Sequence, residues 1–127
     1  MPEARMPETR LILLDSNIFD HLLSDEDAGL LRRAIADGRL CLLRHQCQRT
    51  ELARVPDMAR RAALLALYDA LDGKTASIAL DPMLAADDAL LLLAARHGAW
   101  LVSDDGALAK RAERAMDYAA FRACLSA

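Results

Sequence analysis

Three short, wholly apolar runs constrain this chain more than any other feature. They are Leu11–Leu14, Leu40–Leu43 and Ala99–Val102, and polar or charged residues follow each of them. A strand with no polar position along it is typical of a parallel sheet that is buried on both faces. The runs therefore predict an α/β protein built on such a sheet.

The segments between these runs have helical spacing of apolar residues, or helix start and stop signals. We expect helices around Ile18–Leu23, from a Ser24–Asp27 capping box to Gly38, over 46–54 and 57–71, from Asp81-Pro82 to Gly98, and from Ala107 onward. Residues 75–80 are expected to form a short edge strand, and 118–127 receive no assignment. The fold class is a three-layer α/β sandwich with a mostly parallel central sheet flanked by helices. Residues 10–127 are expected to form a single domain after a flexible tail, 1–9.

Composition narrows the choice of partners. The net charge of −3 is not the broad basic footprint of a duplex-binding protein, and 4% aromatic residues offer no extended base-stacking platform. The three cysteines, an odd number, favour reduced thiols, and no fourth ligand for zinc is evident near Cys41, His45 and Cys47. No apolar run is long enough to cross a bilayer. We expect a cytoplasmic protein that does not enter a membrane.

Acidic residues follow or flank the expected strands. Asp15 comes directly after the first strand, and Asp104-Asp105 follows the last. Glu51 lies in the helix after the second strand, and Asp87-Asp88 lies in the helix that leads to the last. Functional groups in open parallel sheets gather at the carboxyl ends of the strands. Four segments can therefore bring carboxylates to one edge of the sheet.

Each acid also has an ordinary structural explanation. Asp15 can cap the next helix, Asp105 can belong to a turn, and Glu51 can be a solvated helix residue. The presence of all four acidic segments at one sheet edge is what indicates a function. Carboxylates crowded in one cleft repel each other unless a cation neutralises them. Oxygen ligands favour Mg²⁺ or Mn²⁺, and such ions activate water for phosphodiester hydrolysis.

Three stretches resemble the motifs of PIN-domain nucleases, in order and spacing, over nearly the whole length from Leu11 to about Ala112. They are Leu11-Ile-Leu-Leu-Asp15-Ser16-Asn17-Ile18, Thr50-Glu51-Leu52, and Asp87-Asp88-Ala89-Leu90 through His97-Gly98-Ala99-Trp100-Leu101-Val102-Ser103-Asp104-Asp105. The resemblance implies a Mg²⁺- or Mn²⁺-dependent endoribonuclease. It also implies a VapC-like toxin of a bacterial toxin–antitoxin pair, with RNA as substrate, an antitoxin as partner, and a homodimer.

The resemblance assigns roles to individual residues. Asp15, Glu51, Asp87 and Asp105 match the four metal-binding, catalytic acids. Asp88 stays open as an alternative third acid, although a spacing of eleven residues before Gly98 favours Asp87. The supporting polar residues are Ser16, Asn17, Ser103 and Asp104. Because the chain is acidic overall, substrate contacts must come from local basic residues, for which we select Arg44, Arg49 and Lys110.

Two other classes of protein remain as alternatives. A receiver or phosphatase fold also places an aspartate after a strand, but Asn17 stands where a phosphatase has its second aspartate, and Ser103-Asp104-Asp105 stands where a receiver has lysine. A catalytically inactive PIN-like interaction module, or an RNA-processing nuclease that is not a toxin, would carry the same motifs.

Overall fold

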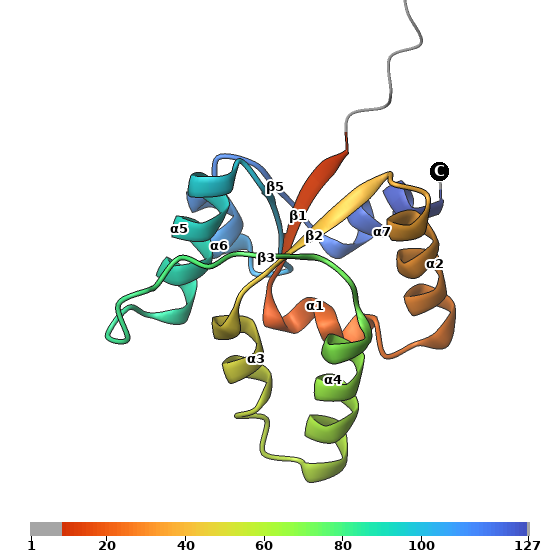
Figure 1. The fold of residues 1–127 in the computed structure, drawn as a ribbon, viewed down its shortest axis with the longest axis horizontal. Coiled ribbons are helices and arrows are strands. Elements are labelled where there is room, and N and C mark those ends of the chain that lie inside the picture. The colour runs from red at the N-terminus through yellow and green to blue at the C-terminus, as the bar shows by residue number, and fades with distance from the viewer. Residues whose placement is uncertain (1–8, 127) are drawn as a thin grey trace, which may run out of the picture.

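The computed structural model describes residues 9–126, so all of the expected N-terminal tail except Thr9 lies outside the described residues. Five strands and seven helices alternate along these residues (Figure 1). The strands are β1 (Arg10–Leu14), β2 (Leu40–Arg44), β3 (Lys74–Thr75), β4 (Trp100–Val102) and β5 (Ala115–Met116). The helices are α1 (Ser16–His21), α2 (Asp25–Ala36), α3 (Gln46–Leu52), α4 (Met58–Ala70), α5 (Ala86–His97), α6 (Gly106–Arg111) and α7 (Tyr118–Ser126).

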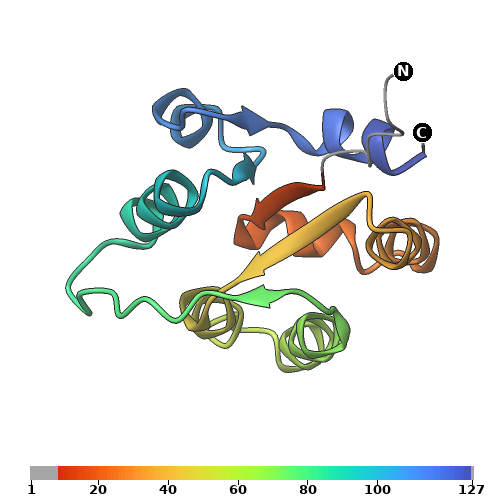
Figure 2. The same cartoon turned by 45° about the horizontal axis from the view of Figure 1, so that its top comes forward.

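The strands form one parallel sheet in the order β3-β2-β1-β4-β5. The chain therefore starts at the centre, builds one half of the sheet through β2 and β3, and then crosses to build the other half through β4 and β5. In Figure 2, α5 and α6 lie on one side of this sheet and α2 lies on the other. The expected three-layer α/β sandwich with a parallel sheet is confirmed.

The strands supply side chains to two separate cores because successive residues of a strand face opposite sides. Ile12 and Leu14 of β1 pack with α1, α2, α4 and α7, whereas Leu13 packs with α5 and α6. In β4, Val102 belongs to the same core as Ile12 and Leu14, and Leu101 belongs to the same core as Leu13. The wholly apolar sequence of these strands thus has a direct cause: both faces of the sheet are covered.

The structure differs from the sequence expectations between β3 and α5. β3 ends at Thr75, and the helix begins at Ala86 rather than at Asp81-Pro82. The Asp81 carboxylate accepts the backbone N–H of Met83 at 2.9 Å and closes a local turn. That turn delays the helix, which then ends at Gly98 as expected, in the left-handed conformation with φ 64°.

Three other features depart from the expectations. The expected capping box is not formed: the side chain of Ser24 makes no capping hydrogen bond, and the Asp27 carboxylate accepts a hydrogen bond from Tyr118 at 2.5 Å. The edge strand β5 and the helix α7 had no counterpart in the sequence assignment.

Within residues 9–126, no helix is both long enough and apolar enough to cross a bilayer.

Candidate functional site

The end of β1 is where the chain's path across the sheet reverses, since β2 continues on one side and β4 on the other. Open α/β sheets bind ligands at such points, outside the carboxyl ends of the strands. Asp15 is the first residue after β1 and is only 8% exposed. Its carboxylate accepts the Ser16 N–H at 2.7 Å and the Ser103 hydroxyl at 2.7 Å, so the ends of β1 and β4 are joined through this side chain.

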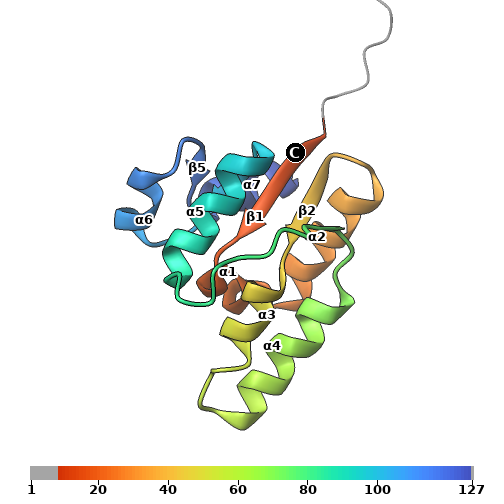
Figure 3. The same cartoon turned by 60° about the vertical axis from the view of Figure 1, so that its left-hand side comes forward.

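Three of the expected acids line one small pocket beside Asp15. They are Asp15, which caps the start of α1, Glu51 in the last turn of α3, and Asp87 in the first turn of α5. These elements are far apart in sequence but meet at the same end of the sheet (Figure 3). The pocket has a volume of about 60 Å³. That space suits a small cation with a water or two.

Asp87 and Asp88 have different surroundings. Asp87 lines the acidic pocket, whereas the Asp88 carboxylate forms an ion pair with Arg111 of α6 at 2.7 Å. Neighbouring residues of a helix point about 100° apart, and here Asp88 is turned toward α6 and does not line the pocket. The geometry therefore favours Asp87 as the third acid of the candidate site.

Asp105 lies outside this pocket. Its carboxylate caps α6 by accepting the backbone N–H groups of Ala107 and Leu108, at 3.0 and 3.2 Å. It is linked to the pocket through Ser103, whose hydroxyl accepts the Asp105 N–H at 3.0 Å while donating to Asp15. A single residue, Ser103, thus connects Asp105 to Asp15 through hydrogen bonds.

The supporting residues divide between the pocket and its surroundings. Ser16 lines the pocket. Asp104 points to α7 and α1: it accepts the Tyr118 N–H at 2.9 Å and contacts His21 at 2.7 Å, and these two partners lower the pKa of its carboxyl. The Oδ1 atom of Asn17 is buried without a hydrogen-bond partner among the described residues.

Gln48 is a site residue that the sequence analysis missed. Its side chain is buried, lines the acidic pocket, and donates to the carbonyl of Leu14 at 2.9 Å. Its oxygen accepts the His45 N–H and the Tyr68 hydroxyl, both at 3.1 Å. Gln48 is the N3 residue of a capping box on α3, three positions after His45, and that spacing was the available signal.

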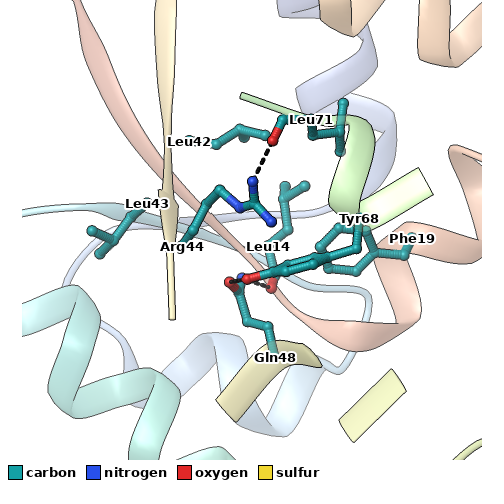
Figure 4. Close-up of a pocket in the computed structure, with 8 residues that line it drawn as sticks. All are labelled: Leu14, Phe19, Leu42, Leu43, Arg44, Gln48, Tyr68 and Leu71. Carbon is teal, nitrogen blue, oxygen red and sulfur yellow. Dashed lines mark hydrogen bonds between the residues drawn. The ribbon is translucent and has the colours of Figure 1, made fainter. Parts of the chain in front are cut away.

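The basic residues expected to bind substrate are mostly engaged elsewhere. Arg44 is partly buried: its guanidinium carbon lies 4.2 Å from the ring centre of Tyr68, and the side chain donates to the carbonyl of Leu71 (Figure 4). Arg49 makes two hydrogen bonds of 3.0 Å with Asp69 of α4. Lys110 is exposed on α6. None of the three lines the acidic pocket.

The donor set of the pocket, three carboxylates, matches the oxygen ligands that Mg²⁺ and Mn²⁺ prefer. With the side chains as they lie, no three His, Cys, Asp or Glu residues within 9–126 are close enough together to hold an ion. The carboxylates would have to turn toward each other, which the exposure of Asp87 and the partial exposure of Glu51 permit.

Comparison with known proteins gives a fold likeness without a sequence match. No protein-family model and no curated protein matches the sequence. The structure is similar to that of the PIN domain endonuclease Utp24, with a TM-score of 0.61 and 17% identity over 80% of this chain and 75% of that one. It is also similar to PAE2754 from Pyrobaculum aerophilum, with a TM-score of 0.54 and 18% identity over 93% and 97% of the two chains. Together with the order and direction of the five strands, these likenesses show that the chain has a PIN-like fold.

Proposed function

We propose that this chain is a metal-dependent endoribonuclease whose site is formed by Asp15, Glu51 and Asp87. The observation that carries the proposal is that these three acidic residues line one pocket at the carboxyl end of the central strand. Two kinds of support agree with it. The motifs of the sequence resemble those of PIN-domain nucleases, and one structural neighbour is described as a PIN domain endonuclease.

The three carboxylates would hold Mg²⁺ or Mn²⁺. When bound, such an ion lowers the pKa of a water molecule and stabilises the charge that develops on the phosphoryl group. The chain's own part is to position the ligands. Ser103 donates to one oxygen of Asp15, and Gln48 ties α3, which carries Glu51, to the end of β1. Arg111 pairs with Asp88 outside the pocket. We propose that Asp105 acts through Ser103 as a positioning residue.

The test is cleavage of a fluorescently labelled single-stranded RNA by the purified chain with Mn²⁺, Mg²⁺ or excess chelator. We expect cleavage with either ion and none with chelator. Asp15→Asn, Glu51→Gln and Asp87→Asn should each lower the rate by roughly 100-fold or more, a loss of about 3 kcal/mol of transition-state stabilisation.

Asp88→Asn is the matched control, because it makes the same chemical change one residue away from Asp87, at a carboxylate paired with Arg111. Its rate should stay within a few-fold of the parental rate. Cleavage that persists in chelator, or equal losses in the Asp87 and Asp88 variants, would contradict the proposed site.

The resemblance to VapC-like proteins extends the proposal to a toxin that an antitoxin neutralises and that forms a homodimer. Induced expression in bacteria should arrest growth for the parental chain and not for Asp15→Asn. Sedimentation at micromolar concentration should give the mass of two chains. Growth that continues despite full cleavage activity would instead favour an RNA-processing nuclease.

One observation favours a second candidate, an inactive PIN-like interaction module: Asp105, the expected fourth acid, is used as a helix cap outside the pocket. Such a module would lack cleavage with every ion tested. Calorimetric titration with Mn²⁺ separates the two candidates further, because only the nuclease requires Mn²⁺ binding that Asp15→Asn abolishes.

A further inference from the structure

A second groove adjoins the acidic pocket. It has a volume of about 420 Å³, within the roughly 300–1,000 Å³ of small-molecule sites. One wall is α3 and the other is the segment that leads from β3 into α5, with Leu80, Pro82 and Leu84. Cys47, Glu51 and Ala86 line both cavities, so whatever lies in the groove also reaches the acidic pocket.

The groove carries two carboxylates, Glu51, which it shares with the acidic pocket, and Asp81, which accepts the Met83 N–H at 2.9 Å. Its other polar side chains fall into two groups. His45 is already engaged: its Nδ1 accepts the Cys47 N–H at 3.0 Å and its Nε2 lies 2.8 Å from the Ile78 carbonyl. Gln46, Thr50 and Arg54 are exposed and follow each other every four residues along the α3 side of the groove. Within residues 9–126, no hydrogen bond engages the side chain of Gln46 or Thr50, and Arg54 has only a loose contact with Glu51, at 3.9 Å.

An apolar wall that faces a row of exposed polar side chains fits an unstacked nucleobase with its phosphate. The apolar wall of Leu80, Pro82 and Leu84 can pack against a flat base. Gln46 and Thr50 can form hydrogen bonds with its edge, as proteins do when they recognise single-stranded RNA. An amide side chain offers a donor and an acceptor together. On the N7 edge of a purine, adenine presents the matching acceptor and donor, whereas guanine presents two acceptors and a pyrimidine has no N7. Arg54, 73% exposed at the rim, suits a phosphate, which carries no sequence information.

We propose that this groove binds the base of the nucleotide next to the cleaved phosphate and that Gln46 and Thr50 select it, with a preference for adenine. The inference rests on the proposed ribonuclease function for the identity of the ligand. It goes beyond that function by naming where base selectivity arises, outside the acidic pocket itself.

The experiment measures binding separately from cleavage. Labelled single-stranded octamers A8, C8 and U8 are titrated with the chain in excess chelator, and fluorescence anisotropy gives each dissociation constant. We expect the parental chain to bind A8 about tenfold more tightly than C8 or U8, the order of one lost base contact. Gln46→Ala combined with Thr50→Ala should bring the three constants within about twofold of each other.

Two controls use residues outside the groove. Thr75→Ala, on exposed β3, should keep the parental preference. Arg54→Ala tests the phosphate contact: it should weaken binding of all three octamers alike and reduce the salt dependence of binding. Its control is Arg96→Ala, at an exposed arginine at the far end of α5, which should change neither. All the altered side chains are exposed, so their melting curves should match that of the parental chain.

Each outcome decides the matter. Equal binding of the three octamers by the parental chain, no binding of any octamer, or a preference that survives in the double variant would each overturn the groove assignment. Cleavage with Mn²⁺ that shows no base preference would leave the nuclease standing and remove the groove. Base-selective binding by an uncleaving chain would uphold the groove and contradict the proposed catalysis.

Discussion

Ser103→Ala should destabilise the chain far more than the loss of one oxygen atom suggests. Ser103 is 2% exposed, and its hydroxyl donates to Asp15 at 2.7 Å and accepts from the Asp105 N–H at 3.0 Å. A hydrogen bond to a charged group contributes about 1.5–3 kcal/mol and a neutral one about 0.5–1.5 kcal/mol. The expected loss in the free energy of unfolding is therefore about 2–4 kcal/mol.

Urea denaturation monitored by circular dichroism measures this loss directly. Ser77→Ala is the matched control: Ser77 is exposed, and its variant should stay within about 0.5 kcal/mol of the parental chain. A double-mutant cycle with Asp15→Ala isolates the charged hydrogen bond, whose coupling should be about 1.5–3 kcal/mol. If Ser103→Ala and Ser77→Ala denature at the same midpoint, the argument that Ser103 joins the ends of β1 and β4 is refuted.

Two further predictions concern stability. The hydrogen bond from Tyr118 and the charge of Arg122 lower the pKa of Asp27 in the folded state, so this carboxylate stabilises the fold above about pH 4, its unfolded pKa. The contribution is lost as pH falls through the folded pKa, and acid titration of Asp27→Asn should show a shallower loss of stability below about pH 4. Gly98→Ala should cost about 1–2 kcal/mol because Gly98 has φ 64°, whereas Gly29→Ala, at an unobstructed position inside α2, should gain about 0.5–1 kcal/mol. Equal thermal shifts for the two glycine variants would contradict the conformational explanation.

Much of the fold could be predicted because the buried strands carry strong local signals. The runs that form β1, β2 and β4 are apolar at every position, and Gly98 ends α5 through its backbone conformation. β5 could not be predicted in this way, because its two residues depend on pairing with β4 rather than on their own pattern.

The candidate site was predictable only in part. Asp15 and Glu51 follow from their positions after strands, but Asp87 and Asp88 cannot be distinguished by periodicity, because residues 89–95 of the helix are apolar on all faces. The structure separates them, because Asp87 lines the acidic pocket and Asp88 pairs with Arg111 of α6. Likewise, nothing local in the sequence shows that Tyr68 comes close enough to engage Arg44.

The two cores on either side of the sheet differ in size, and this difference affects how the site can move. Among the described residues, nineteen buried side chains form the core on the α1, α2, α4 and α7 side of the sheet, and nine form the core on the α5 and α6 side. Local opening costs least where few apolar side chains are buried, so we expect α5 to open more readily than β1 and α3. Such opening would move Asp87 away from Asp15 and Glu51. A ligand that bridges the three carboxylates would stabilise the packing of α5 on the sheet by its binding free energy.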